Sequence, residues 1–452
     1  MDSTALTVVM LGGMVFAAHV FTELFSRRRV PDLLLLLIIG VLLGPIFKIV
    51  TPDAFGTTGD VFSTITLVII LFESGSELSL KIIQESFKGM ISLTLISYFS
   101  IMVVLGILGH YCLGLPWVTS FFMGAVLGGA AEAIVIPLTK QLKISGNCKT
   151  TMVLETSFST VICFIISIAL LNAIQDNDFS FGKVVGNVIS SFTLAGIIGF
   201  IGAVFWATAL RRIRTVKNST FTTPAFVFII YGINSLLGFS GEIAALTFGI
   251  TLANIDSIYN SMFKKIFKEK PYTLNNNERM LFSEIAFLLR TFVFIYIGIS
   301  MKISDWRSLL VGIAIVFILF ILRTLSVRFS IVKKGNEYTE LETMYMSCFV
   351  SKGLAAAVLA TMLTMIDVPG AEMVKNIVYS VIFFSIIATC LLIPAVEKSK
   401  IAQKTLRFML FFSPQKVKKE ADDTVSDEEN SLQQIDNQDV IFNENNSEKN
   451  CD

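Results

Sequence analysis

Long apolar segments, separated by short polar loops, follow one another along most of this chain. An α-helix needs about 20 apolar residues to cross roughly 30 Å of hydrocarbon, so an apolar segment of roughly 17–25 residues is a candidate membrane span. We expect thirteen spans, at 4–25, 31–48, 61–80, 88–113, 116–140, 149–173, 183–210, 222–238, 241–255, 279–301, 307–328, 344–366 and 374–396. This pattern predicts an all-α integral membrane protein. A single long helix over 222–255 is the alternative to two short spans there.

The charges of the loops predict the orientation of these spans. Lys and Arg concentrate in the cytoplasmic loops of multi-pass membrane proteins. The loops at alternate ends of the expected spans carry the basic residues Arg27, Arg28, Arg29, Lys81, Lys88, Lys140, Lys143, Lys149, Arg211, Arg212, Arg214, Lys217, Lys264, Lys265, Lys268, Lys270, Arg328, Lys333 and Lys334. The opposite loops hold few cations and several acids, among them Asp53, Asp176 and Asp367. We therefore expect a protein of the cell membrane with its N-terminus outside and its C-terminus in the cytoplasm.

The end of the chain differs in character from the rest, which divides the protein into three parts. Residues 1–397 are predicted to form one transmembrane domain. Residues 398–419 alternate basic side chains with Leu and Phe, which is typical of an amphipathic juxtamembrane segment that binds anionic lipid. Residues 420–452 are acidic and rich in Asn, Gln and Ser, with few apolar residues, so we expect a disordered cytoplasmic tail.

Composition excludes several classes of protein. The 452 residues are 54% hydrophobic and 16% charged, and a mean hydropathy of +0.72 is too apolar for a soluble domain of this size. A net charge of +1 gives no indication of nucleic-acid binding. The six cysteines occur singly, without the spacing of metal ligands. The sequence contains no nucleotide-binding loop and no nucleophile–base set, so neither an enzyme nor a resident cofactor or metal is predicted.

Two consecutive expected spans carry one carboxylate each within their apolar sequence. Glu132 lies in the segment 116–140, and Glu155 lies in the next one, 149–173. An ionisable side chain inside the membrane is costly and is a functional-site hypothesis by default. The sequence Gly-Gly-Ala-Ala before Glu132, and Pro137 after it, also disfavour a continuous helix. Irregular backbone at membrane depth is tolerated where it lines a cavity or where neighbouring helices satisfy its polar groups. These features together predict an ion site.

A second interrupted span occurs near the end of the membrane domain. In the segment 344–366, the sequence Ser351-Lys352-Gly353 interrupts an apolar run. Paired broken helices at corresponding places in two halves of a chain indicate an inverted-repeat transporter with its binding site at the membrane midplane. We therefore expect the two broken helices to cross there and to point their helix ends at the site.

Five motifs, in their order and spacing, carry a resemblance to a known family. They are RRRVPDLLLLLIIGVLLGP, LVIILFESGSELSL, YGINSLLGFSGEIAALTFGITLAN, RTFVFIYIGISM and SKGLAAAVLA. Over about residues 5–396 the chain resembles the prokaryotic sodium/proton antiporters of the NhaP type, within the monovalent cation/proton antiporters. The resemblance implies thirteen helices, a core domain that rocks against a dimerisation domain, and a homodimer. It also implies exchange of Na⁺ or Li⁺, or K⁺ in some relatives, for H⁺ by alternating access.

The chain departs from this family at the ion site. The family pattern Glu-Ser-x-x-Asn-Asp is here Glu155-Thr156-Ser157-Phe158-Ser159-Thr160, so the Asn and Asp positions hold Ser and Thr. The family's Thr-Asp-Pro aligns with Ala130-Ala131-Glu132, which moves the carboxylate by one residue. The cation that is commonly Arg before Gly-Leu is Lys352.

The altered site leads to one hypothesis with two open alternatives. We expect Glu132, Thr156, Ser159 and Thr160 to bind the transported cation together with backbone carbonyls of the segment 116–140. Glu155 is expected to form a structural ion pair with Lys352 or Arg290 that cancels charge within the membrane. In the first alternative, Glu132 is itself paired with a cation and binds no ion. In the second, the protein is a non-transporting or regulatory relative that has lost the usual ion-binding Asp.

Overall fold

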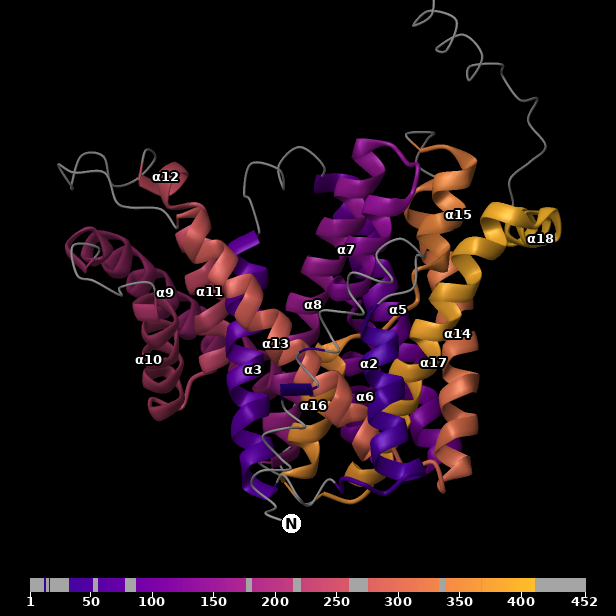
Figure 1. The fold of residues 1–452 in the computed structure, drawn as a ribbon, viewed down its shortest axis with the longest axis horizontal. Coiled ribbons are helices and arrows are strands. Elements are labelled where there is room, and N and C mark those ends of the chain that lie inside the picture. Colours follow the sequence, from indigo (N-terminus) through magenta and orange to yellow (C-terminus); the bar gives the residue numbers. More distant parts are fainter. Residues whose placement is uncertain are drawn as a thin grey trace, which may run out of the picture. The chain divides into compact units, whose positions relative to one another are not determined.

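The structure is a computed structural model, and it describes residues 12–13, 16, 32–51, 56–77, 87–175, 181–213, 221–259, 275–332, 338–366 and 368–410. Within these residues every regular element is a helix (Figure 1). The helices are α2 (Asp32–Val41), the π-helical turn η1 (Leu42–Ile46), α3 (Gly56–Glu77), α5 (Phe87–Leu113), α6 (Trp117–Gly128), α7 (Glu132–Gln141), α8 (Gly146–Gln175), α9 (Phe181–Ile213), α10 (Thr222–Leu236), α11 (Gly241–Ala253), α12 (Ile255–Ile258), α13 (Asn276–Ser300), α14 (Trp306–Ser330), α15 (Glu340–Cys348), α16 (Leu354–Thr364), α17 (Ala371–Lys398) and α18 (Lys400–Leu410). The predicted all-α fold is confirmed.

Each expected span from 31–48 onward contains a helix or a pair of helices. Six helices in the described part are long and apolar enough to cross a membrane, and six further apolar helices are shorter. Two separate helices, α10 and α11, occupy 222–255, because a turn with Gly238 at φ 78° and the extended Ser240 interrupt the helical path. The first expected span, 4–25, lies almost entirely outside the described residues, so the count of thirteen stays a prediction.

The two predicted helix breaks are confirmed. The segment 116–140 forms α6 and α7, which are separated by extended backbone at Gly129 (ψ 151°) and Ala131 (φ −92°, ψ 93°). The segment 344–366 forms α15 and α16, which are separated by residues 349–353. Glycine at each break disfavours helix. The irregular backbone around Ser351 and Lys352 needs polar partners within the protein.

The helices pack as two groups. We call the set α5, α6, α7, α8, α14, α15, α16 and α17 the crossing group, because it contains both broken helices. The set α2, α3, α9, α10, α11 and α13 is the platform group. Most helix–helix contacts fall within a group; between the groups, α16 contacts α3 and α13, α17 contacts α2, and α8 contacts the consecutive helix α9.

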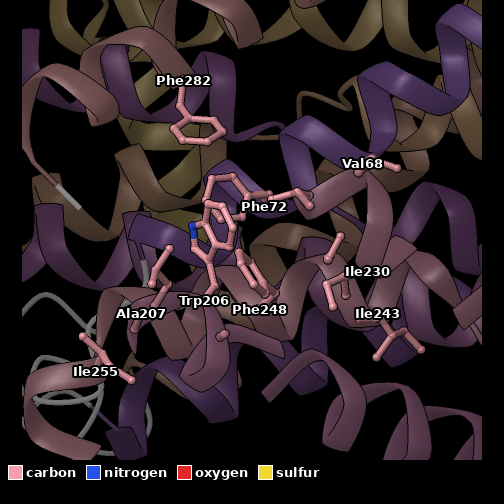
Figure 2. Packing of buried hydrophobic residues seen from close by; sticks show 14 of the residues in the cluster. Val68, Phe72, Trp206, Ala207, Ile230, Ile243, Phe248, Ile255 and Phe282 are labelled. Atoms are coloured by element: carbon pink, nitrogen blue, oxygen red, sulfur yellow. The ribbon is translucent and has the colours of Figure 1, made fainter. Parts of the chain in front are cut away.

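Small residues and aromatic rings hold the platform group together. A Cβ on Gly249 of α11 would meet the carbonyl oxygen of Phe72 in α3, so these two helices touch through their backbones. Next to this contact, the ring centroids of Phe72 and Phe282 lie 4.5 Å apart, and those of Phe72 and Phe248 lie 5.8 Å apart. Trp206 joins the same buried cluster (Figure 2). Close backbone approach with buried aromatic packing gives a well-packed apolar body.

Candidate functional site

The two helix breaks touch each other, as the sequence predicts for crossing broken helices. The backbone N–H of Ala131 donates a hydrogen bond to the carbonyl oxygen of Ser351, at 3.2 Å. A Cβ placed on Gly353 would lie 3.0 Å from the Cα of Ala131, so the two breaks meet at a position where only glycine fits without adjustment. The crossing therefore satisfies part of the backbone that the breaks leave outside helical hydrogen bonding.

Lys352 closes the crossing with its side chain. The residue is 4% exposed, and its Nζ donates to the carbonyl oxygen of Gly129 at 3.1 Å. Gly129 directly follows the last residue of α6, so the ammonium lies at the negative end of that helix. The backbone N–H of Lys352 donates to Ser385 Oγ of α17 at 3.0 Å. The prediction that Lys352 is an ion-pair partner of Glu155 was wrong, because its ammonium reaches the backbone of the other broken helix instead.

Glu155 forms its ion pair with Arg323 of α14. The guanidinium binds both carboxylate oxygens, with Nη1–Oε1 2.5 Å and Nη2–Oε2 2.8 Å, and the two side chains are 3% and 6% exposed. Arg323 Nε also donates to the carbonyl oxygen of Met346 in α15, at 3.0 Å. This fork-like geometry satisfies both charges and ties α8, α14 and α15 together. The expectation of a buried ion pair at Glu155 is correct, whereas both proposed partners were wrong.

Arg290 belongs to a different ion pair, in the platform group. Its Nη2 lies 3.1 Å from each carboxylate oxygen of Glu73 in α3. The side chains of Arg290 and Glu73 are 25% and 12% exposed, so this pair is less buried than the pair of Glu155. Arg290 is therefore excluded as the partner of Glu155, because its own helix packs against α3 in the other helix group.

The predicted hydroxyl ligands occupy one turn of α8 beside the break after α6. Ser159 Oγ accepts from the backbone N–H of Ala130 at 3.2 Å, and it donates to the carbonyl oxygen of Thr156 at 2.9 Å. Thr160 Oγ1 lies 3.3 Å from the carbonyl oxygen of Ala130 and 2.9 Å from that of Thr156. The hydroxyl of Thr156 donates within its own helix, to Val153. The structure thus brings Ser159 and Thr160, but not the hydroxyl of Thr156, onto the irregular backbone.

Glu132 is the first residue of α7, two positions after Ala130. An acidic side chain in the first turn of a helix is stabilised by the positive end of the helix dipole. The residue is half-buried, and its Oε1 atom is buried. The crossing therefore holds a carboxylate at the start of one half-helix and the ammonium of Lys352 at the end of the other.

These groups suit a small hard cation. Such a cation prefers carboxylate, carbonyl and hydroxyl oxygens. Around the break, the carbonyl oxygens of Gly129 and Ala130 and the hydroxyls of Ser159 and Thr160 lie close to the helix that begins with Glu132. Glu155 and Arg323 neutralise each other, while the carboxylate of Glu132 begins α7 and the ammonium of Lys352 binds the carbonyl oxygen of Gly129.

Arg323 is the site residue that the sequence reasoning missed. It lies in the apolar sequence FILFILRTLSV, inside the segment 307–328, whose two ends carry Arg307 and Arg328. A cation inside a span is a signal of the same kind as the carboxylates of Glu132 and Glu155. The signal was therefore present, although the sequence does not show that Arg323 faces Glu155 across 168 positions.

Comparisons with known proteins agree with the predicted fold. The sequence model of a family described as "Sodium/hydrogen exchanger, transmembrane" matches residues 14–398. The Na(+)/H(+) antiporter 1 of Methanocaldococcus jannaschii is 20% identical over 380 residues, which cover 81% of this chain and 84% of that protein. The K(+)/H(+) antiporter NhaP2 of Shewanella baltica is 20% identical over 402 residues, 86% of this chain and 66% of that protein.

A solved structure has the same arrangement of helices. The structure of the sodium proton antiporter MjNhaP1 from Methanocaldococcus jannaschii at pH 8 matches with a TM-score of 0.69 and 18% identity, over 89% of this chain and 99% of that one. The inverted-repeat antiporter fold is thereby confirmed. Because the family model covers nearly the whole membrane domain, the chain belongs to the sodium/hydrogen exchanger family of transmembrane proteins.

Proposed function

We propose that this protein exchanges a monovalent cation for protons across the cell membrane by alternating access, with Na⁺ as the first candidate and Li⁺ or K⁺ as further ones. Membership of the sodium/hydrogen exchanger family supports the reaction class. The relatives are named as Na(+)/H(+) and K(+)/H(+) antiporters, which leaves the choice of cation to experiment. The single observation that carries the proposal is the crossing of the two broken helices, where Glu132 begins α7.

Glu132 is proposed as the carboxylate that binds either the cation or the proton. A cation that replaces a proton on one carboxylate leaves the net charge of the site unchanged, so exchange of one monovalent cation for one proton is electroneutral. The carbonyl oxygens of the break and the hydroxyls of Ser159 and Thr160 are the proposed additional ligands. Thr156 is proposed to position these ligands through its carbonyl oxygen, which accepts hydrogen bonds from the hydroxyls of Ser159 and Thr160.

Arg323 and Lys352 are proposed to stabilise the crossing rather than to carry the ion. The pair of Glu155 and Arg323 keeps two buried charges fully satisfied. Lys352 links the two breaks, because its Nζ donates to the carbonyl oxygen of Gly129. In this division of roles, Glu132 is the carboxylate that responds to cation and proton concentration.

Alternating access is proposed to be a movement of the crossing group against the platform group. The contacts support this division, because both broken helices lie in one group and most helix–helix contacts fall within a group. We further propose a homodimer, an N-terminus outside, a cytoplasmic C-terminus, and the division into a membrane domain (1–397), a lipid-binding segment (398–419) and a disordered tail (420–452).

Transport in vesicles tests the proposal. Purified protein is reconstituted into liposomes that contain a trapped pH dye, a pH gradient is imposed, and Na⁺, Li⁺ or K⁺ is added in turn. We expect at least one cation to dissipate the gradient. The variant Glu132→Gln removes the titratable group while preserving the size of the side chain, and we expect it to abolish the response.

The matched control is Glu372→Gln, which removes an exposed carboxylate that pairs with Lys302 and Lys375 at the start of α17. This control variant is expected to retain full exchange. Equal activity of Glu132→Gln and wild type would overturn the assignment of Glu132. Failure of all three cations to dissipate the gradient, with folded protein, would overturn the proposed reaction and favour a non-transporting relative.

A further inference from the structure

Helix α18, which directly follows the last long helix of the membrane domain, has two different faces. One face packs against α14, α15 and α17, and its side chains Leu406 and Leu410 are buried. On the other face, Ile401 is 80% exposed and Phe408 is 76% exposed. These two residues are seven positions apart, which places them on the same side of the helix.

Basic residues border this exposed apolar face. Lys400 and Lys404 are exposed: Lys400 directly precedes Ile401, and Lys404 lies within about a turn of both Ile401 and Phe408. Arg407 is also exposed on this side of the helix. Large apolar side chains flanked by cations are the surface that an interfacial helix presents to a membrane with anionic headgroups. The charge of the face is complementary to such lipids.

Arg407 connects this helix to one of the broken helices. Its guanidinium binds both carboxylate oxygens of Glu340, the first residue of α15, with Nη2–Oε2 2.7 Å. Helix α15 ends at Cys348, immediately before the break that contains Lys352. A displacement of α18 therefore acts on the half-helix that leads directly to the crossing.

The first turn of α15 is also joined to the loop that follows the other broken helix. Glu342 caps α15 by accepting from the backbone N–H of Thr339 at 2.8 Å. The same carboxylate accepts from the backbone N–H of Ser145 at 2.6 Å, in the loop between α7 and α8. Glu340 and Glu342, both in the first turn of α15, thus connect this helix to α18 and to the loop between α7 and α8.

From these contacts we propose that α18 binds the anionic surface of the bilayer and that the pair of Arg407 and Glu340 transmits this binding to α15. The lipid composition of the membrane then sets the position of the half-helix at the crossing. The lipid contact rests on the lipid-binding segment 398–419 of the proposed function, whereas the coupling to α15 goes beyond it and holds whichever cation is carried.

A fluorescent label on α18 tests the lipid contact. The full chain carries Thr405→Cys on the exposed face of α18, with Cys112 and Cys451 replaced by Ser. It is reconstituted into phosphatidylcholine vesicles with or without phosphatidylglycerol, and nitroxide-labelled lipid serves as the quencher. We expect strong quenching with phosphatidylglycerol, weak quenching without it, and a decrease when salt is added.

Charge variants show whether the basic face is responsible. Lys400→Gln with Lys404→Gln is expected to weaken the attraction to the anionic surface about fivefold for each lysine. The matched control, Lys302→Gln with Lys375→Gln, removes the same charge from the residues that pair with Glu372. Quenching that is independent of phosphatidylglycerol, or equally weakened by both double variants, would overturn the proposal.

The acidic segment 420–452 is the competing occupant of the basic face. Deletion of this segment is expected to leave the quenching by phosphatidylglycerol-containing vesicles intact. A change of the label signal on deletion, in vesicles without phosphatidylglycerol, would assign the face to the segment and overturn the lipid proposal.

Hydrogen exchange of residues 340–348 tests the transmission. We expect phosphatidylglycerol to change the exchange rate of α15 severalfold in the wild type and not in Glu340→Gln, which retains every cation of α18. Glu372→Gln is the control and is expected to behave as the wild type. An identical lipid response of α15 in Glu340→Gln would contradict the coupling. Because neither readout requires transport, failure of these tests is distinguishable from failure of the proposed exchange.

Discussion

Both helix groups bring helices close together through glycine, as Gly124 of α6 does against Met102 of α5, but the two broken helices belong to the crossing group. In the platform group, α3 and α11 touch through Gly75 and Gly249, and aromatic rings fill the space beside them. In the crossing group, two helices stop and restart, and the ammonium of Lys352 joins their breaks through the carbonyl oxygen of Gly129. The pair of Glu155 and Arg323 ties the neighbouring helices α8 and α14 together.

The contrast between continuous and interrupted helices indicates which group is suited to bind an ion. Continuous helices in backbone contact form a body in which nearly every polar group of the main chain is used internally. Interrupted helices leave backbone groups and charges that must find partners elsewhere, and the same groups are suited to bind a small cation. Variants of equivalent contacts in the two groups should therefore have unequal effects.

The largest effect is expected from breaking the buried ion pairs. Arg323→Met leaves the carboxylate of Glu155 buried without its partner, which should lower the free energy of unfolding by about 3–5 kcal/mol. Arg290→Met, in the platform group, should cost less, because the side chains of Arg290 and Glu73 retain 25% and 12% exposure. Unfolding of both variants in mixed micelles measures the difference. An equal loss in the two variants would contradict the unequal burial of the pairs.

A second comparison concerns backbone contact in the platform group. The Cβ of Gly249→Ala would collide with the carbonyl oxygen of Phe72, so we expect α3 and α11 to separate at a cost of about 1–3 kcal/mol. The control is Gly232→Ala in α10, where a Cβ meets nothing within 4 Å. Unfolding should distinguish these variants, while the exchange rate per folded molecule stays that of the wild type. Loss of exchange in folded Gly249→Ala would contradict a purely structural platform.

Replacement of a glycine in the crossing group should instead affect the exchange rate more than the stability. The Cβ of Gly353→Ala would lie 3.0 Å from the Cα of Ala131, so the two breaks must move apart by a few tenths of an ångström. We expect a stability loss of only about 1 kcal/mol, with a severalfold lower exchange rate. The vesicle assay and unfolding, measured on the same preparation, separate the two effects. A normal exchange rate in Gly353→Ala would show that the crossing geometry is unimportant.

The smallest effect is expected at the end of the crossing group, at the cap of α14. Asp305 accepts hydrogen bonds from the hydroxyl and backbone N–H of Ser308, which lower the pKa of its carboxyl below the usual value. A carboxyl whose pKa is lower in the folded state stabilises the fold above its unfolded pKa, and this contribution is lost as the pH falls through the folded pKa. Asp305→Ala should therefore cost about 1 kcal/mol at neutral pH.

The pH dependence provides the check on this prediction. The stability difference between wild type and Asp305→Ala should shrink as the pH is lowered below about 4, where Asp carboxyls take up protons. A difference that is constant from neutral to acidic pH would show that the cap acts without its charge.

The sequence predicted the positions of the helices and breaks, because these depend on local composition. Apolar length defines a span, and Gly129 or Gly353 within a span defines a break. The partners of charged side chains could not be predicted in this way. Whether Glu155 meets Arg323, Lys352 or Arg290 depends on the rotation and depth of each helix, which apolar segments of similar composition do not encode. Lys352 illustrates the point, since its ammonium binds the carbonyl oxygen after α6 instead of pairing with a carboxylate.

The most direct measurement is the release of protons from the purified, weakly buffered protein when a cation is added. If cation and proton compete for the carboxylate of Glu132, each bound cation releases a proton near the pH at which this carboxylate titrates. The account predicts that Glu132→Gln loses this release and that Glu73→Gln, in the platform group, keeps it. Undiminished proton release from Glu132→Gln, with cation binding intact, would contradict the assignment of the exchanging group to the crossing of the broken helices.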